Sequence, residues 1–303
     1  MSTNTKIQWT DATINPIIGC TKISPACDHC YAEVMANRLS YIKNTVRYIN
    51  VVNANGKWNG STNLINSELL KPYHWKKPKN IFICSMSDMF HESVPFTWID
   101  AIFNMMSDCD WHIFQILTKR PQRVLDYLDY KNKQLEIVPW YIPSNIWFGV
   151  TVENQDQANK RIPILLKIPA DCRFISCEPL LGEIDLESIQ QFNGDGVHIA
   201  SYQVLTPIYN SGDSNRPALD QVIVGPETGT KKRPMKKEWI ENIYNSCKKY
   251  DVSFFDKKNT LGLDKREIPV HKIINRSTYT FTLGKKRFEH TPGKKVKRLK
   301  NLY

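Results

Sequence analysis

Three cysteines near the start of the chain are the residues best suited to chemistry. Cys20, Cys27 and Cys30 are spaced C-x6-C-x2-C on a segment that contains Gly19 and Pro25. A Cys-x2-Cys pair directs both sulfurs to one side of a turn, and a short loop brings the third sulfur to them. Four protein ligands close a structural metal site, whereas three leave one coordination position open. Because no second Cys-x2-Cys pair lies nearby, the spacing predicts a [4Fe–4S] cluster with one iron free to bind a cofactor.

A structural zinc site is the main alternative interpretation of the same cysteines. It would need a fourth ligand, and His29 and Cys84 are the residues available for that role. His29 is equally suited to stack on a bound adenine ring. The remaining cysteines are scattered among apolar residues, and we expect them to be mostly small core residues. They are Cys84, Cys109, Cys172, Cys177 and Cys247.

The composition is that of a folded protein without a membrane span. The chain has 303 residues, of which 41% are hydrophobic, enough for one large domain or two small ones. No window approaches the roughly 18 consecutive apolar residues of a membrane-spanning helix. The first ten residues are polar and lack the apolar region of a signal peptide. We therefore expect a cytoplasmic protein whose cysteines stay reduced, which favours metal ligands over disulfides.

The positive charge is concentrated toward the C-terminus. The formal net charge is +11, and residues 228–303 hold 21 Lys and Arg against 7 Asp and Glu. The preceding residues therefore carry a small negative balance. A basic block of this kind predicts a polyanionic partner, most often a nucleic acid. The alternative is a solvated basic surface without a partner, and the composition does not decide between the two.

Short apolar runs alternate with helical patterns along most of the chain. Buried parallel strands read as continuous apolar runs joined by helical crossovers, so the alternation predicts an α/β fold. About six or seven such units indicate a partial or full (β/α) barrel of parallel strands. The predicted strands are Ile14–Ile18, Asn80–Cys84, Trp111–Leu117, Asn145–Val150, Arg173–Ser176, Gln221–Gly225 and Val252–Phe255. The predicted helices are 31–42, Ser67–Leu70, Thr97–Ser107, Pro121–Tyr130, Asn154–Arg161 and Lys236–Lys249, with Thr97 as an N-cap and Pro121 in a first turn.

The same pattern divides the chain into a barrel domain and a basic extension. Residues 1–257 form the barrel, with insertions at 43–79 and 182–217. The second insertion is rich in Gly, Asn, Asp and Ser, and we expect it to be a loop over the barrel mouth. Residues 258–303 lose the alternation and form a basic C-terminal tail or small subdomain, in which residues 278–283 alternate like a strand.

Charged and hydroxyl residues follow nearly every predicted strand. The carboxyl ends of parallel strands meet at one edge, where such barrels place their active sites. Each residue alone has a plainer interpretation: Glu153 as a helix cap, Asp88 as a turn residue, or Lys119 and Arg120 as a solvated helix start. Their occurrence at corresponding positions favours a shared site. The residues are Ser85, Ser87, Asp88, Lys119, Arg120, Glu153, Glu178, Glu227 and Lys257.

A three-cysteine loop after the first strand of a (β/α) barrel resembles the radical S-adenosylmethionine superfamily. The chain resembles more closely the phage-associated three-Cys-motif proteins of unknown function, over about residues 5–257. The stretches that carry this resemblance are residues 7–13, 19–25, 27–33, 85–88, 115–121, 149–155, 176–182 and 224–229. The sequence departs from the superfamily in its C-x6-C-x2-C spacing, where C-x3-C-x2-C is usual. It departs from the phage family at Pro226, where that family usually has a glycine.

The resemblance implies a cofactor, a reaction and roles for the candidate residues. Three cysteines would hold the cluster, whose fourth iron would bind S-adenosylmethionine, and an electron donor would drive formation of a 5′-deoxyadenosyl radical. The cofactor-binding residues implied by position are His29, Ser85, Ser87, Asp88, Lys119, Glu153, Glu178 and Glu227, with Arg120 and Lys257 as further partners for anionic groups. We assign no catalytic acid or base.

Three functions follow from these observations. The first is a radical S-adenosylmethionine enzyme that modifies or repairs a nucleic acid or nucleotide, which joins the cysteine motif to the basic C-terminal quarter. The second is a non-catalytic nucleic-acid-binding protein with a structural zinc at the same cysteines. The third is a radical enzyme acting on a protein or a small molecule. Neither the substrate nor the oligomeric state is specified by the sequence.

Overall fold

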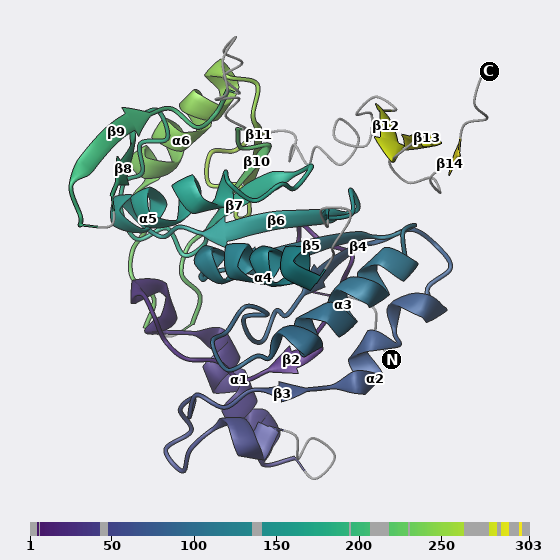
Figure 1. The fold of residues 1–303 in the computed structure, drawn as a ribbon. Helices are drawn as coiled ribbons and strands as arrows, with labels where there is room; N and C mark the ends of the chain where they lie inside the picture. The colour runs from purple at the N-terminus through teal and green to yellow at the C-terminus, as the bar shows by residue number, and fades with distance from the viewer. Residues whose placement is uncertain are drawn as a thin grey trace.

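The computed structural model describes most of the chain (Figure 1). The described residues are 5, 7–42, 48–134, 141–193, 195–206, 218–229 and 231–263, with the backbone of 279–283, 286–290 and 297–298. Two predicted segments fall largely elsewhere: most of the basic tail 258–303, and residues 207–217 of the second insertion. Both lie outside the described residues.

A curved sheet of seven parallel strands forms the centre of the fold, in the spatial order β1-β4-β5-β6-β7-β10-β11. Its strands are β1 (Ala12–Ile14), β4 (Asn80–Ile83), β5 (Ile113–Thr118), β6 (Ile146–Thr151), β7 (Arg173–Cys177), β10 (Gln221–Val224) and β11 (Ser253–Asp256). Neighbouring strands are parallel throughout the sheet. Because β1 and β11 do not pair with each other, the sheet is a half-barrel, which confirms the predicted partial (β/α) barrel.

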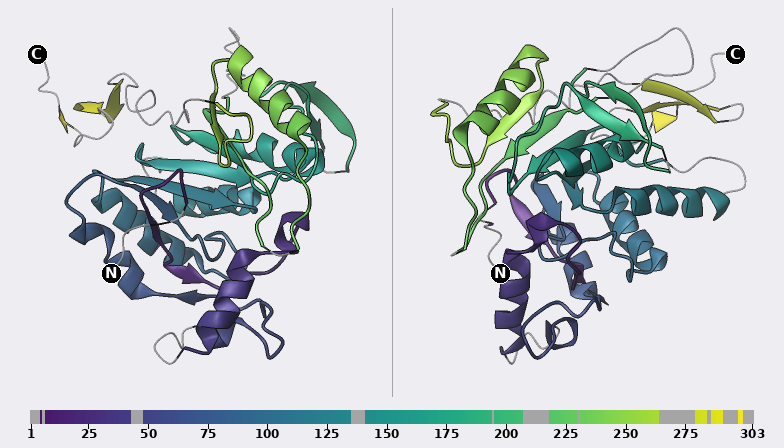
Figure 2. Two further views of the ribbon diagram at one scale, coloured as in Figure 1. Left: turned by 180° about the vertical axis from the view of Figure 1, so that it is seen from behind. Right: turned by 90° about the vertical axis from the view of Figure 1, so that its left-hand side faces the viewer.

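Helices cover the outer face of this sheet, from α3 to α6 (Figures 1 and 2). The α-helices of the described residues are α1 (Tyr31–Ser40), α2 (Asn66–Leu69), α3 (Phe96–Asp108), α4 (Pro121–Gln134), α5 (Gln155–Leu165) and α6 (Lys237–Lys249). Most connect consecutive parallel strands as crossovers, as expected for βα units. The side chain of Asn154 caps α5 by accepting a hydrogen bond from the Gln157 amide. The predicted cap at Thr97 is wrong by two residues, because the cap is Pro95, whose extended backbone precedes the first turn.

Alternate residues along the strands divide the core into two layers. Ile175 and its counterparts pack against helix residues such as Ile102 and Ile162 in the outer layer. Phe174, next along β7, instead packs with Trp9 and Trp147 on the concave side. The period of two in a strand produces this separation. Continuous apolar runs were therefore a correct signal for strands that are buried on both faces.

The connecting segments add small antiparallel pairs. Strand β2 (Ile17–Ile18) pairs with β3 (Asn63–Leu64), so the first predicted strand, 14–18, is divided in two around Asn15 and Pro16. Strands β8 (Ile189–Phe192) and β9 (His198–Tyr202) form a hairpin. Strands β12 (Tyr279–Leu283), β13 (Lys286–His290) and β14 (Lys297–Arg298) form a third antiparallel sheet, and β12 coincides with the strand predicted at 278–283.

The second insertion does not cover the barrel mouth where the structure describes it. Asn159 of α5 accepts a hydrogen bond from the Gln190 amide of β8. The Glu187 carboxylate is bound by Ser246, Lys249 and Tyr250 at the end of α6. These contacts hold the described part of 182–217 against the outer helices. The prediction failed because composition identifies a loop-rich segment but not the surface on which it packs.

Helix α1 directs its apolar stripe outward. Tyr31, Val34, Met35 and Ile42 recur at helical spacing, and between 42% and 52% of each side chain's surface is exposed. The opposite face, with Ala32, is buried. Small residues therefore form the packed side of this helix, and its larger apolar residues remain on the surface.

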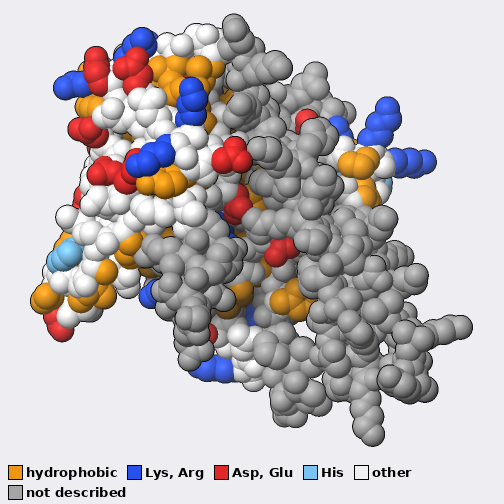
Figure 3. Space-filling view, turned by 90° about the horizontal axis from the view of Figure 1, so that it is seen from above, with side chains coloured by type: hydrophobic (Ala, Val, Ile, Leu, Met, Phe, Trp, Pro, Cys, Tyr) orange, Lys and Arg blue, Asp and Glu red, His pale blue; other side chains and the backbone are white. Residues whose placement is uncertain are grey.

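The charged surface residues and the apolar character of the helices bear on partners and membranes. Seen from above, the left-hand part of the surface carries Lys and Arg side chains beside Asp and Glu side chains (Figure 3). Among the described residues, none of the helices has the length and apolar character needed to cross a bilayer.

Replacing Gly149 with alanine tests the packing of the concave layer. A Cβ built on Gly149 in β6 would lie 2.4 Å from the Phe174 ring on β7. We expect Gly149→Ala to lower the free energy of unfolding by about 1–3 kcal/mol, because added volume strains a filled core. Urea denaturation measures the change. Adding Phe174→Leu should recover part of the loss, and strictly additive losses in the double variant would contradict the clash.

Candidate functional site

A cavity of about 640 Å³ opens at the carboxyl ends of the strands. Cys20, Cys27 and Cys30 all line it, and all three are free thiols. Predicted site residues that also line it are His29, Ser85, Ser87, Asp88, Lys119, Arg120, Glu178, Glu227 and Lys257. Glu153 is the exception, because it is fully buried behind the cavity wall. The structure thus brings together twelve of the candidate side chains that the sequence placed in separate motifs, with Arg120 and Lys257 among them.

The segment from Cys20 to Cys30 is called the cysteine loop. It is preceded by a glycine that no other residue can replace without strain. Gly19 follows β2 and bridges to Ser87 in a parallel arrangement. Its φ of +91° is unfavourable for residues with a side chain, and a Cβ would lie 2.1 Å from the Ser61 carbonyl oxygen. The close approach of these backbones fixes the direction in which Cys20 leaves the strand.

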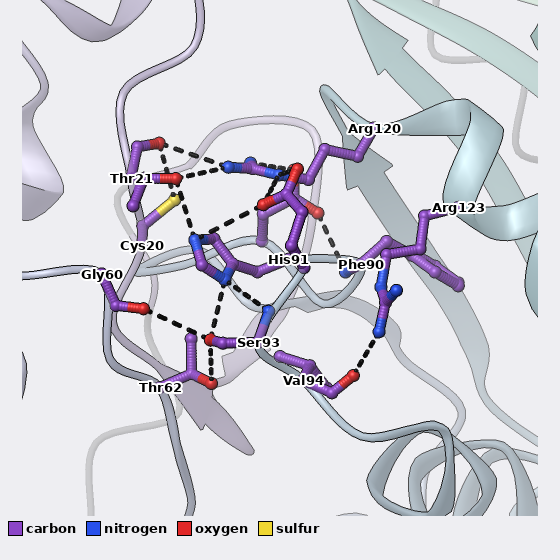
Figure 4. Close-up of polar contacts among 12 residues, drawn as sticks. Cys20, Thr21, Gly60, Thr62, Phe90, His91, Ser93, Val94, Arg120 and Arg123 are labelled. Carbon is purple, nitrogen blue, oxygen red and sulfur yellow. Dashed lines mark hydrogen bonds and ion pairs between the residues drawn. The ribbon is translucent and has the colours of Figure 1, made fainter.

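The first anchor of the cysteine loop is the hydroxyl of Thr21 (Figure 4). The Arg120 guanidinium donates to Thr21 Oγ1 at 2.8 Å, and the His91 ring lies 2.9 Å from the same oxygen. His91 Nδ1 accepts from the Ser93 amide, so Nε2 carries the proton and donates to Thr21. Burial lowers the pKa of His91, which favours this neutral ring. The residue next to Cys20 is thereby held from two sides.

The Asp88 carboxylate holds Arg120 in position for this anchor. One carboxylate oxygen accepts from the Thr118 hydroxyl at 2.7 Å and from the Phe90 amide at 3.0 Å. The other accepts from the Lys119 amide at 3.0 Å and from Arg120 at 3.2 Å. The carboxylate predicted to contact a cofactor is therefore engaged in the structure by the protein itself, and it orients Arg120 toward the cysteine loop.

The second anchor is Glu153. Its carboxylate accepts a hydrogen bond from the Ala26 amide at 3.1 Å, inside the short 3₁₀ turn that precedes Cys27. Arg161 of α5 binds the other oxygen at 2.9 Å, and both side chains are almost completely buried. A buried carboxylate needs such a partner, because an unpaired charge in the interior is costly. Glu153 therefore supports the loop from behind and does not face the cavity.

The third anchor is Arg233, in the segment that follows β10. Its guanidinium donates to the Pro25 carbonyl at 2.8 Å and lies 3.4 Å from the Asp28 carboxylate. Glu227 forms an ion pair with the same guanidinium and also lies 3.1 Å from Nδ1 of His29. These contacts close the loop from the side opposite Thr21.

The other predicted residues are held by nearby groups. The Ser85 hydroxyl donates to Asn15, and the Ser87 hydroxyl donates to the Ile17 carbonyl at 2.7 Å. Glu178 and Lys257 form an ion pair across the cavity wall. Both serines therefore fix the turn after β4, while the ion pair joins the ends of β7 and β11.

Burial and charge shift two titrating groups of the site in opposite directions. Burial, reinforced by Asp88, raises the pKa of the Cys20 thiol to about 12, so the free thiol stays protonated at neutral pH. Hydrogen bonds from Arg233 lower the pKa of Glu227 to about 2. A thiol of this kind ionises when a metal replaces its proton, since the thiolate is the ligand form.

No single-ion site is preformed in the described part of the chain. Within it, no group of three or more His, Cys, Asp or Glu side chains is arranged to hold one metal ion. His29 lies beside Glu227, and Cys84 is a buried residue at the end of β4 that also lines the cavity.

Sequence reasoning missed the residues that hold the loop. They are His91, Arg161 and Arg233: His91 and Arg233 contact residues 70 and 208 positions away, whereas Arg161 pairs with Glu153, which itself reaches Ala26 over 127 positions. The only local signal was the charge of Arg161 on the buried face of a predicted helix. Pairing over such separations is visible only in the folded chain.

Removing Arg233 tests the third anchor through its pH dependence. The folded-state pKa of Glu227 lies below its ordinary value of 4.5, so its contribution to stability is complete above that pH and is lost as the pH falls toward 2. We expect Arg233→Ala to cost roughly 2 kcal/mol at pH 7 and much less at pH 3. Urea unfolding at both values measures this, and an equal loss at both would contradict it. Lys237→Ala, in an exposed ion pair, is the control.

Removing Arg161 tests the second anchor. Arg161→Met would leave the Glu153 carboxylate buried without a counterion, and we expect a loss of about 3–5 kcal/mol in stability. Adding Glu153→Gln removes that charge and keeps an oxygen for the Ala26 amide. The double variant should therefore be more stable than Arg161→Met, as measured by thermal or urea unfolding. If it is less stable, the pair does not act as described.

Comparisons with known proteins place the chain in one family. No curated protein and no solved structure matches it significantly. One family model covers residues 4–280, which is most of the sequence. The chain therefore belongs to the family described as protein of unknown function (DUF5131).

Proposed function

We propose that this protein is a radical S-adenosylmethionine enzyme with a [4Fe–4S] cluster on Cys20, Cys27 and Cys30. The observation that carries the proposal is the meeting of three free thiols on one cavity at the carboxyl edge of a half-barrel. Thiolates are the ligands that iron–sulfur clusters take from proteins. Parallel α/β folds bind cofactors at this edge of the sheet.

The donor set fits a cluster better than a single ion. A cubane cluster takes each thiolate on a different iron, so its three sulfurs surround a volume and need not converge on a point. The absence of a single-ion group in the described residues is compatible with that requirement and gives no support to a four-ligand zinc site. The three anchors would keep the sulfurs in place while the cluster is absent.

The residues of the chain have definable tasks in such an enzyme. With cluster and cofactor bound, one electron from a donor would break a carbon–sulfur bond of the sulfonium and yield methionine and a 5′-deoxyadenosyl radical. Trp9, Phe82 and Leu117 line the cavity with apolar surface that excludes water from a reactive species. The half-buried Lys119 offers a cation to a carboxylate or phosphate at the wall.

Glu178 and Glu227 would meet the cofactor differently. Glu227 is already occupied by Arg233 and His29, so it would orient His29 and not bind a ligand directly. Glu178 is engaged by one cation, Lys257, and retains acceptor capacity toward the cavity. It is therefore the carboxylate we favour for an amino or hydroxyl group of the cofactor.

Anaerobic reconstitution with iron and sulfide tests the proposal. We expect the full chain to take up about four irons, to turn brown, and to release 5′-deoxyadenosine from S-adenosylmethionine when it is reduced. Cys27→Ala should abolish both the colour and the cleavage. Cys109→Ala, which removes a buried thiol outside the cavity, should retain both. One zinc per chain and no colour would overturn the proposal, as would cleavage by the Cys27 variant.

A further inference from the structure

A run of basic residues surrounds Arg233, the third anchor of the cysteine loop. Residues 231–237 contain Lys231, Lys232, Arg233, Lys236 and Lys237. All four lysines are exposed, and only the arginine is partly covered. Five cations in seven residues with no acid among them form the densest positive segment that the structure describes with side chains.

This basic segment lies at the rim of the cavity. Thr228, which precedes the segment, lines the cavity, and Arg233 within the segment contacts the Pro25 carbonyl of the cysteine loop. Lys231 and Lys232 stand between these two fixed points. A Cβ added at Gly229 would meet no other atom within 4 Å, so this part of the rim is open. The anchor that holds the loop therefore also fixes two lysines beside the mouth.

The charge of these lysines is only partly balanced. Lys237 pairs with Glu241, and Lys236 lies over the Trp239 ring at 5.4 Å. Lys231 and Lys232 form no ion pair or side-chain hydrogen bond with any residue the structure describes. Arg233 is paired with Glu227 and lies 3.4 Å from Asp28, so these two acids are directed at the arginine. The side chains of Lys231 and Lys232 are thus available to a ligand at the rim.

Apolar and aromatic surface borders the same mouth. Tyr31 and Met35 of α1 line the cavity while about half their surface remains exposed, and Trp58 lines it beside them. Val34 and Ile42 extend this surface along the helix. Inside the cavity, the Lys119 side chain has no ion pair or hydrogen bond with the described residues, although it lines the wall.

We propose that the cavity mouth binds single-stranded nucleic acid. Its phosphates would lie on Lys231 and Lys232, its bases against Tyr31 and Trp58, and one nucleotide would reach toward Lys119. Cations that follow a backbone beside aromatic rings are the pattern of single-strand recognition. An acidic protein would use the lysines but leave the aromatic residues that point into the cavity without a role. The inference names the substrate class and rests on the proposed function for the chemistry, though not for the binding.

Charge reversal at the rim tests the phosphate contacts. The probe is a fluorescein-labelled twelve-nucleotide strand of mixed sequence, as DNA and as RNA, with the full chain and measured by anisotropy. We expect Lys231→Glu with Lys232→Glu to weaken binding about 10-fold or more at 0.1 M salt. The slope of log affinity against log salt should become shallower by about 1.4, that is, about 0.7 for each lost contact.

A matched control is available at the opposite edge of the sheet. Lys76 and Lys77 are exposed neighbours that precede β4, whereas the cavity lies at the carboxyl ends of the strands. Lys76→Glu with Lys77→Glu makes the same change in net charge and should leave affinity within about 2-fold. Equal weakening by both pairs would overturn the inference, because it would show attraction to net charge alone. Undetectable binding of the unaltered chain would overturn it as well.

A second pair of variants tests the apolar border. Val34→Ser with Met35→Ser should weaken binding about 3-fold or more without changing the salt slope, because apolar contacts release no counterions. Val197→Ser with Ile199→Ser, on exposed residues of the β8–β9 hairpin, should have no effect. Competition by polyglutamate at matched charge as strong as competition by the oligonucleotide would overturn the inference in favour of an acidic polypeptide.

The outcomes also separate this inference from the proposed function. The Lys231 and Lys232 variant should still take up iron and cleave S-adenosylmethionine in the absence of nucleic acid. Oligonucleotide binding by a chain that takes up no cluster would leave the binding intact and overturn the chemistry. Cluster loading without oligonucleotide binding would overturn this inference and leave the proposed chemistry intact.

Discussion

The fixed position of the cysteine loop is the constraint on which the rest of the structure depends. Three thiols can serve one centre only if the backbone between them is held, and a loop of eleven residues has no core of its own. Three contacts supply that support: Arg120 binds Thr21, and Arg233 binds the Pro25 carbonyl. Glu153 binds the Ala26 amide and is itself paired with Arg161. All three arginines are paired with buried carboxylates, so the stabilising charge is largely kept away from water and is weakly screened.

The half-barrel explains why these arginines can reach the loop. Parallel strands bring their carboxyl ends to one edge, so β5, β6 and β10 deliver Arg120, Glu153 and Arg233 to a common region although their segments are far apart in sequence. Crossover helices on the outer face occupy the other side of the sheet. The concave side is thereby left to aromatic packing at its base and to the cavity above, and polar groups concentrate where the strands end.

Sequence reasoning predicted the framework well and the supporting contacts poorly. Six of the seven strands were visible because a strand buried on both faces is apolar throughout, and shifts of one or two residues, as at Trp111 and Cys84, follow from the loose definition of an element's end. Strand β1 was not, because it shares only Ile14 with the strand predicted at 14–18. Most of the selected strand-end residues line one cavity, Glu153 excepted, but the contact that each makes was not predictable. Asp88 and Glu153 are carboxylates in the right places, and which cation or amide satisfies each is set by packing between distant elements. Helix α1 shows a related limit, because periodicity identifies an apolar stripe but not whether that stripe faces the core.

The separation between the cysteine loop and its anchors has a consequence for synthesis. The loop lies within the first 30 residues, whereas its contacts with Arg120, Glu153 and Arg233 span 99, 127 and 208 positions along the chain. During translation the thiols leave the ribosome long before the groups that orient them, and they remain reactive and unsupported until most of the polypeptide has emerged. An inorganic centre held by the supported form of this loop would accordingly assemble late, after the segment that follows β10 has emerged.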